Sequence, residues 1–496
     1  MKTMLISFAC LLFLTDCRNL LEENLEGNYS NASFYKTEAH ALLAVSGIYN
    51  ACSFSSYDNI LWVFGDVASD DAVKGSSAGD QSDIAYLEQF NYNRSNSCLD
   101  KIWKRYYEGI SRANYFLYYG RNIQMQEALK NRLLNEAKFI RAYFYFNLVN
   151  IFGEIPLKLN PPLTSDDINK PKSSATDVYA QIEKDLGDAI QALPVAYPPA
   201  DVGRATKGAA LGLLAKAHLY QRKWDKAADD AAAIEALGIY SLRPKYADNF
   251  IKATQNNSES LFEMQHISGQ IPNLGNSLVQ WLSPRGSEAG INGWGFDVPV
   301  ENLVKEYEKT AEGISDPRLD YTIGRPGHTW SDGIEYNPGW SASGYSQRKN
   351  QQSKTDAPIT GDANLNYVYL RYADILLIKA EALNEQHKPE AALLPLNQVR
   401  KRARESYLYD RNLVGYGTVP AGLLPEVVST DEAFVRDAIR HERRVELAME
   451  FHRFFDLMRY GKTAAEQALS NTHFKYETHR FFLIPQSELD ANPLIK

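Results

Sequence analysis

An internal repeat constrains the fold of this chain more than any other feature. The segments LLAKAHLYQRKWDKAADDAAAI (213–234) and LLIKAEALNEQHKPEAALLPLNQVR (376–400) each place Leu-Leu-x-Lys-Ala before a turn region and an alanine-rich stretch. Alanine lets two helices approach closely, and neighbouring helix pairs of this kind bury each other's apolar faces. The segment AKFIRAYFYF (137–146) has the pattern of another first helix. We therefore predict a mostly α-helical fold with at least three tetratricopeptide-like helix pairs.

Apolar residues at helical spacing extend this prediction along the chain. They place the repeats at about residues 99–264 and 366–460, with an irregular segment between them. Helices are expected over residues 39–50, 99–119, 126–151, 175–193, 207–221, 224–237, 370–385, 389–404 and 431–459.

The last of these helices ends in IRHERRVELAMEFHRFFDLMRYG (439–461), which carries more charge than solubility requires. One face is apolar at the 3.6-residue period of a helix. Three oppositely charged pairs are spaced i,i+3, namely Arg443 with Glu446, Glu450 with Arg453, and Asp456 with Arg459. We interpret these charges as an ion-pair network, partly below the surface, that fixes the C-terminal element to the rest of the chain.

Four long blocks of sequence indicate a family. They are LNEAKFIRAYFYFNLVNIFGEIPL (134–157), NYVYLRYADILLIKAEALNE (366–385), the charged segment 439–461 and LIPQSELDANPLIK (483–496). In content and order they resemble the SusD/RagB family of Bacteroidetes surface lipoproteins. The resemblance implies a SusD-like domain over residues 35–496. It also implies a protein that captures a nutrient and delivers it to a SusC-like TonB-dependent outer-membrane transporter.

The N-terminus has the features of a lipoprotein export signal. Lys2 precedes an apolar run of signal-peptide length, and no other stretch approaches the ~20 residues that span a bilayer. The run ends in Leu-Thr-Asp-Cys, which resembles a bacterial lipobox, although Asp16 departs from the usual small residue. We predict a signal peptide over residues 1–16, lipidation of Cys17 and an acidic tether over residues 17–34. The protein is then anchored in the outer membrane and exposed on the cell surface.

Composition narrows the class of ligand. The net charge of -8 and the pI near 5.7 give no basic field for a phosphate backbone, which argues against nucleic acid. Aromatic residues make up 12% of the chain and include 30 Tyr. Tyr presents an apolar face and a polar tip, which suits the binding of polar ligands.

Residues 265–352 form an irregular insert in which helical periodicity disappears and Gly, Pro, Asn and Trp accumulate. Long irregular segments inside compact domains usually carry function. A Trp ring can stack on the apolar face of a sugar while amide and guanidinium groups bond its hydroxyls. Candidate ligand contacts are therefore Trp281, Trp294, Trp330 and Trp340, with support from Tyr336, Tyr345, Arg285 and Asn292. The alternative for Trp281 and Trp294 is a structural role, pinning the insert to the helices.

A second variable segment, residues 65–97, is rich in Asp, Ser, Gly and Asn. In the SusD-like family the ligand site lies on a face built from such an early segment and the later insert, so the resemblance points to these regions and transfers no single contact. Asp70 and Asp71 could bond sugar hydroxyls or a cation, or form a solvated acidic turn. No cofactor is expected, although the acidic residues leave room for a structural calcium ion.

Cysteine usage fits an exported protein. Cys10 leaves with the signal peptide, and Cys52 and Cys98 could form a disulfide in an oxidising compartment. Spacing alone does not show that the two side chains meet.

Two other classes of function fit the sequence less well. Residues 75–79 match G-x-S-x-G but lack the buried strand and following helix of a nucleophile elbow, and His441-Glu442 lacks the second His of a metalloprotease. A catalytic pair of carboxylates, as in a glycoside hydrolase, stays an open alternative, because nothing in the sequence singles out one pair. A pure protein-interaction scaffold would need neither the lipid anchor nor the Trp-rich insert. We predict a non-enzymatic binder of oligosaccharides; the alternative ligand is a peptide, as RagB-type members of the family take.

Overall fold

The computed structural model describes residues 34–286, 292–330, 333–356 and 361–495. The predicted signal peptide, Cys17 and nearly all of the tether lie outside these residues. Within them, no helix combines the length and the apolar character that crossing a membrane requires.

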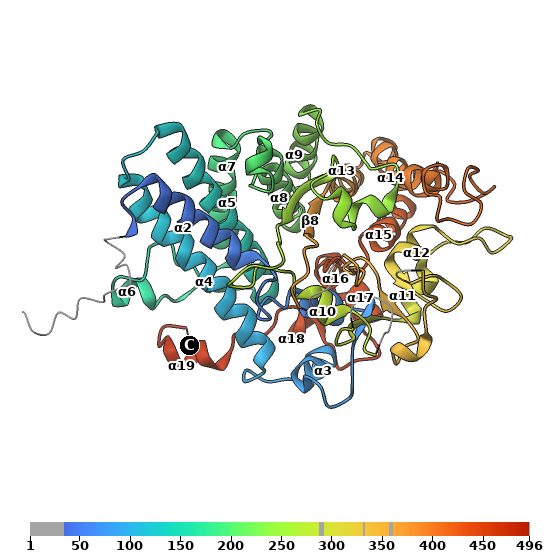
Figure 1. Cartoon of the computed structure of the whole chain (residues 1–496), viewed down its shortest axis with the longest axis horizontal. Coiled ribbons are helices and arrows are strands. Elements are labelled where there is room, and N and C mark those ends of the chain that lie inside the picture. The colour runs from blue at the N-terminus through green and yellow to red at the C-terminus, as the bar shows by residue number, and fades with distance from the viewer. Residues whose placement is uncertain (1–33, 287–291, 331–332, 357–360, 496) are drawn as a thin grey trace, which may run out of the picture.

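Long helices form most of the molecule, and Figure 1 shows them as a curved row that runs from α2 to α14. Each packs against its neighbours, as in α4 with α5, α8 with α9 and α13 with α14. Their bounds confirm the predicted helices to within a few residues, apart from the one over 431–459. They are α2 Glu38–Cys52, α4 Ser97–Tyr119, α5 Glu127–Phe152, α7 Ala175–Ala192, α8 Lys207–Tyr220, α9 Trp224–Ala236, α13 Tyr372–Glu385 and α14 Pro389–Tyr409.

The turns of two helix pairs confirm the internal repeat. Arg222 and His387 both adopt a left-handed conformation (φ 57° and 61°), and the following Lys223 and Lys388 both precede the next helix directly. The Leu-Leu-x-Lys-Ala motif nevertheless does not mark equivalent positions. Counted from the helix starts at Lys207 and Tyr372, Lys216 corresponds to Glu381 and not to Lys379.

The predicted helix over 431–459 is two helices, α15 Glu432–Leu447 and α16 Arg453–Tyr460. Met449 and Phe451 between them have positive φ angles (61° and 66°). The backbone of Phe451 lies so close to Gly65 that a Cβ there would be 2.3 Å from its carbonyl oxygen. The prediction of one continuous helix was wrong, because these contacts with distant segments override local helical periodicity.

The break redirects the charged side chains. Of the predicted i,i+3 pairs, only Asp456 with Arg459 forms, at 2.8 Å. The Glu450 carboxylate instead accepts hydrogen bonds from Arg371 (2.8 Å) and Lys349 (2.7 Å). Arg443 binds Asp374 and Asp456, and Arg453 binds Asp70. The partners that bind these side chains come mostly from elements far away in the sequence.

These contacts belong to what we call the central charge network. Glu446 lies at its centre, accepting hydrogen bonds from Arg318 (2.9 Å), Arg371 (2.5 Å) and Arg402. Burial alone would raise the pKa of Glu446, but the three guanidinium groups outweigh burial and hold it well below its usual range. The network joins α15, α14 and β8, so the predicted ion-pair role is confirmed and extends far beyond one helix. Its members are Glu259, Arg318, Lys349, Arg371, Arg402, Glu442, Glu446 and Glu450, all at most 4% exposed in their side chains.

The strands are short and pair antiparallel in twos. They are β1 Ala72–Gly75, β2 Ile155–Pro156, β3 Lys172–Ser173, β4 Ser260–Met264, β5 Phe296–Pro299, β6 Ile323–Gly324, β7 Ser346–Gln347 and β8 Tyr367–Arg371. The pairs are β1–β5, β2–β3, β4–β8 and β6–β7. Because Met264 pairs with Tyr367, the segment between them, which contains the whole insert, begins and ends in one sheet.

Shorter helices complete the fold. In Figure 1 the insert helices lie below and to the right of the long row, and α19 lies near the C-terminus at the lower left. In the described part of the chain, the remaining α-helices are α3 Ser82–Glu88, α6 Ser165–Ile168, α10 Leu278–Leu282, α11 Glu301–Glu306, α12 Arg318–Thr322, α17 Lys462–Ala468, α18 Tyr476–His479 and α19 Gln486–Ala491.

The proposed disulfide between Cys52 and Cys98 does not form. Both thiols are free and buried, Cys52 at the end of α2 and Cys98 in the first turn of α4. The Cys52 thiol donates to the carbonyl oxygen of Tyr49 (2.9 Å). Burial raises the pKa of both thiols to about 12, so both stay protonated. Each serves as a small core residue.

Candidate functional site

The early variable segment and the insert meet in the β1–β5 sheet. Val73 pairs with Val298, and the amide of Ser76 donates to the carbonyl of Gly295 (2.6 Å). Gly75 has a positive φ of 73°, and a Cβ there would collide with the Gly295 carbonyl, so this close approach requires glycine. The structure thus brings together the two regions that the resemblance associated with the ligand face.

Aromatic rings gather beside this sheet in a cluster that we call the aromatic junction: Tyr57, Trp62, Trp281, Trp294 and Phe296. Trp281 packs edge-on against Trp294 with ring centroids 4.6 Å apart, and Trp62 lies 5.6 Å from Trp281. Tyr57 lies over Trp294 at 5.3 Å, with a tilt of 31° between the rings. The cluster grades from a buried interior to an exposed edge.

The exposed edge is made by Tyr57 and Trp294. Tyr57 is 39% exposed and Trp294 is half-buried, whereas Trp281 is only 3% exposed. This burial favours the structural alternative for Trp281, and its ligand contact stays a prediction. Trp294 combines both roles, because one part of the ring packs on the core and another part reaches the surface.

Polar groups border this edge. The Tyr57 hydroxyl donates to Oε1 of Gln280 (2.6 Å), and the Gln280 carbonyl accepts from the amide of Trp294 (2.8 Å). Arg285 is exposed and binds Asp80 and Ser77 of the early segment. Asn292 is exposed and accepts from the amide of Gly286 (2.8 Å). An amide, a guanidinium and a phenol beside an open ring are groups that bond sugar hydroxyls.

The other aromatic candidates form a separate unit, the hairpin cluster, made of Trp330, Tyr336 and Trp340. Trp330 and Tyr336 are 4% and 2% exposed, because both rings pack over Gly324, where a Cβ would be 2.4 Å from the indole. Arg348 lies over the Trp330 ring at 5.9 Å. Both rings are enclosed in this structure, and their ligand contact stays a prediction.

Trp340 and Tyr345 remain candidates. Trp340 is half-buried and meets Tyr336 edge-on at 5.4 Å. The half-buried Tyr345 donates its hydroxyl to Glu301, at the start of α11. Their contact with a ligand stays a prediction.

Asp70 and Asp71 are ion-paired side chains and not a solvated turn. Asp70 accepts two hydrogen bonds from Arg453 (2.7 and 2.9 Å), and Asp71 accepts one from Arg444 (2.8 Å). Burial alone would raise the pKa of Asp70, but Arg453 and Arg444 outweigh burial and lower it. Both residues therefore anchor α15 and α16 to the early segment. Their ion pairs occupy these carboxylates in the structure, and their direct contact with sugar or a cation stays a prediction.

A third set of acids lies behind the ligand face, and we call it the buried acid joint: Asp66, Asp71 and Asp297. Asp297 accepts from Nε2 of Gln347 (2.6 Å), which links β5 to β7. Both carboxylate oxygens of Asp66 and Oδ1 of Asp297 lack a donor in hydrogen-bond geometry among the residues that the model describes. Burial, then repulsion from neighbouring carboxylates, raises the pKa of Asp66 well above its ordinary value. Burial and Asp71 likewise raise the pKa of Asp297, so these carboxyls bind protons more tightly than exposed acids do.

A cavity of about 510 Å³ adjoins this region between α2 and β4. Apolar side chains line most of it, including Phe262, Met264 and Leu274. His266 lies in its wall and accepts from the amide of Phe54 (3.1 Å), three residues before Tyr57. Burial lowers the pKa of His266 to about 4, so its ring is neutral at physiological pH.

No group of three or more His, Cys, Asp or Glu side chains in the described ranges is placed to hold a metal ion. The structural calcium ion stays a prediction.

Sequence reasoning missed Tyr57 and Gln280. Tyr57 lies in a short polar turn after α2, where nothing marks it as different from the other Tyr residues. Gln280 directly precedes Trp281 in α10, and adjacent helical residues do not face the same side, so the spacing gave no signal for it.

The fold and this face define a class of protein: a helical-repeat binding protein whose ligand face combines an early segment with a late irregular insert. Comparison with known proteins identifies the family. A family model described as "SusD family" matches residues 258–495, and one described as "Starch-binding associating with outer membrane" matches residues 31–219. The chain belongs to the SusD family.

Relatives and solved structures match nearly the whole chain. SusD-like protein P38 of Formosa agariphila is 27% identical over 93% of this chain and 92% of its own. The structure of a laminarin binding SusD-like protein is 30% identical, with a TM-score of 0.77 over 93% of this chain and 99% of its own. A SusD-like carbohydrate binding protein from Bacteroides fragilis is 25% identical, with a TM-score of 0.79 over 93% of this chain and 100% of its own.

Proposed function

We propose that this protein binds an oligosaccharide at the cell surface and delivers it, chemically unchanged, to a SusC-like TonB-dependent transporter of the outer membrane. The observation that carries the proposal is the exposed edge of the aromatic junction. There, Tyr57 and Trp294 present open ring surface beside Gln280, Arg285 and Asn292. Sugars offer an apolar ring face and a border of hydroxyls, which this arrangement complements.

The comparisons support a glycan as the ligand. The chain belongs to a family with a starch-binding description, and it is 30% identical to a protein named for binding laminarin. Laminarin is therefore the first polysaccharide to test. The alternative ligand, a peptide, would depend less on open aromatic rings.

The absence of catalysis is part of the proposal. The Gly75–Gly79 segment is a turn after β1, and Ser77 contacts Arg285 and Lys74 and no general base. Such a serine has no partner to activate it as a nucleophile. Release of reducing ends from laminarin by the purified protein would contradict this part.

The binding experiment compares Tyr57→Ala and Trp294→Ala with the unchanged protein in affinity electrophoresis and calorimetry on laminarin. Each variant should lose ~1 to 3 kcal/mol of binding free energy, the loss typical of an aromatic anchor. Tyr118→Ala is the matched control, because Tyr118 is an exposed aromatic on α4, outside the ligand face. Retention of full affinity by both junction variants, with a ligand in hand, would refute the site.

The delivery step needs a partner, because a lipid-tethered binder does not itself move a ligand across the membrane. Affinity purification of the lipidated protein from mild detergent should recover one large outer-membrane barrel in near-equal amount. Cys17→Ala should release the protein from the membrane fraction and abolish fatty-acid labelling. Recovery of the protein alone, under conditions that preserve other complexes, would leave a free-standing binder.

A further inference from the structure

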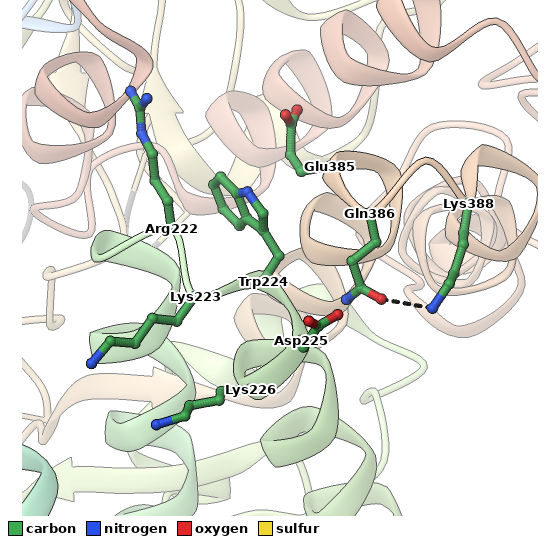
Figure 2. Close-up of a pocket in the computed structure, with 8 residues that line it drawn as sticks. All are labelled: Arg222, Lys223, Trp224, Asp225, Lys226, Glu385, Gln386 and Lys388. Carbon is green, nitrogen blue, oxygen red and sulfur yellow. Dashed lines mark hydrogen bonds between the residues drawn. The ribbon is translucent and has the colours of Figure 1, made fainter.

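A recess of about 550 Å³ opens at the turns of two helix pairs, formed without any residue of the aromatic junction (Figure 2). Residues 222–226 line it from the α8–α9 turn, and Glu385, Gln386 and Lys388 line it from the α13–α14 turn. The two turns meet because α13 packs against α9. The recess is therefore a product of how the repeats stack.

Trp224 supplies an aromatic ring to this recess. It is the first residue of α9, is half-buried, and packs partly on the hydrophobic core. Figure 2 shows the indole projecting into the space between Arg222 and Glu385. Among the described residues it stacks on no other ring, and no cation lies over it. A Trp placed in this way resembles Trp294 of the junction more than the enclosed Trp330.

The charges around Trp224 are unbalanced. Arg222 donates to the backbone carbonyl of Arg459 (3.0 Å), and Lys388 donates to the side-chain oxygen of Gln386 (2.8 Å), the dashed line in Figure 2. Both acceptors are neutral, so no carboxylate compensates either cation in these two hydrogen bonds. This contrasts with the central charge network, where each cation binds carboxylates.

The remaining charged groups do not restore the balance. Lys223 and Lys226 share one carboxylate, Glu183, with Lys226 at 3.8 Å. Glu385 is paired with Arg436, which donates to both of its carboxylate oxygens. Among the residues that line the recess, Asp225 is the acid without a cationic partner. In a chain with a net charge of -8, this local excess of positive charge stands out.

We propose that this recess is a second saccharide site, which takes an acidic sugar residue stacked on Trp224 with its anionic group bound by Arg222, while Lys388, on the other side of the recess in Figure 2, adds positive charge to the site. An indole favours the apolar face of a sugar ring, and charge-assisted hydrogen bonds favour a carboxylate or sulfate on that ring. The inference rests on the proposed function only in taking a glycan as ligand. It uses none of the junction residues, so either site can fail alone.

The test measures binding of trigalacturonate and of a sulfated carrageenan tetrasaccharide, with laminarihexaose as the neutral comparison. Trp224→Ala should weaken binding of the acidic probe at least 10-fold, and the double variant Arg222→Gln, Lys388→Gln at least 5-fold. Binding of the acidic probe should also weaken steeply with added salt. The double variant keeps Trp224 and changes only exposed residues, so it remains informative if Trp224→Ala fails to fold.

The matched control is Lys104→Gln, an exposed lysine on α4 that should change nothing. Tyr57→Ala, Trp294→Ala should lose the neutral glycan and keep the acidic probe, which separates this site from the junction. The response to the uronate and to the sulfate tells which anionic group the recess takes. Absence of binding by either acidic probe, or equal affinity in the unchanged protein and the double variant, would overturn the proposal.

Discussion

The central charge network and the buried acid joint are both almost fully buried, yet carboxyl pKa values are lowered in the network and raised in the joint. In the network, Glu446 is surrounded by Arg318, Arg371 and Arg402, and its pKa is held well below the usual range. In the joint, Asp66 and Asp297 face each other with few donors, and their pKa values are raised. One region is stable because it is ionised, and the other because it holds protons.

The two regions have different roles in the fold. The network ties together α14, α15 and β8, which form the scaffold, and breaking a fully compensated buried set leaves uncompensated charge. The joint lies where the early segment meets the insert, behind the ligand face. Acidification should therefore weaken the scaffold, and alkaline conditions should weaken the joint. The four predictions below test this contrast, from the largest effect to the smallest.

Removing one cation from the network should have the largest effect. Arg371→Met leaves Glu446 and Glu450 short of a partner, so the free energy of unfolding should fall by ~3 to 5 kcal/mol. Urea denaturation at pH 7 measures it. Lys104→Met, which breaks an exposed pair with Asp100, is the control and should cost less than ~1 kcal/mol. A loss of that small size in Arg371→Met would show that the network is dispensable.

Replacing the Asp297 carboxyl of the buried acid joint by a neutral amide should raise the free energy of unfolding, the reverse of the Arg371→Met effect. The folded pKa of Asp297 lies above its unfolded value, so the folded state holds a proton that the unfolded state releases as pH rises above about 4. Stability is lost over that window, and Asp297→Asn removes the loss. Asparagine also tolerates the positive φ of 55° at this position. The variant should be more stable by ~1 to 2 kcal/mol at pH 8, with a smaller gain at pH 4.

Thermal unfolding across pH 4 to 9 measures this difference. Asp166→Asn, a change at an exposed acid of α6, should show no pH-dependent gain. A destabilised Asp297→Asn at pH 8 would mean that the ionised carboxylate is needed, and the contrast with the network would collapse.

The third prediction concerns His441, at the edge of the central charge network. Burial alone would lower its pKa, but its ring N–H groups donate to the carboxylates of Glu306 and Glu308, and these hydrogen bonds outweigh burial and raise the pKa to about 9. Its stabilisation is then complete below pH 6.5 and disappears as pH rises through 9. His441→Gln should cost ~1 kcal/mol at pH 6 and almost nothing at pH 10. Denaturant curves at the two pH values should show this, and equal costs at both would rule out the charged form.

The smallest effect concerns cysteine. Neither region depends on a covalent link, because Cys52 and Cys98 are free in the structure. Adding a reductant should shift the melting temperature by less than about 1 °C, since a disulfide would contribute roughly 2 to 4 kcal/mol. A fall of several degrees would show that a disulfide forms after all.

Local patterns predicted the long helices well, because apolar periodicity over α5 or α7 needs no knowledge of distant partners. They failed at residues 448–452, where the chain turns to meet Gly65 and to aim Glu450 at Arg371. Both contacts are far apart in sequence, so no local window contains them.

The same limit applies to the candidate site. Trp330 and Trp294 both lie among Gly and Asn or Asp, yet the first is enclosed over Gly324 and the second reaches the surface. Local composition indicated an aromatic site without deciding which rings are open. The pairing of the early segment with the insert was inferred from family resemblance, and the β1–β5 sheet provides its physical basis.

The pairing of β4 with β8 has a consequence for how such proteins diversify. Met264 and Tyr367 are partners in one short sheet, so the whole insert leaves and rejoins the helical scaffold at a single point. The entropic cost of closing a loop grows only slowly with its length, so inserts of different sizes can be joined at the same pair of strands, β4 and β8. A graft made between these two strands should carry its own recognition surface, but it must also supply cations in place of Arg318 and Lys349, which the insert contributes to the central charge network. New specificities can then arise by exchange of one module that keeps these two cations.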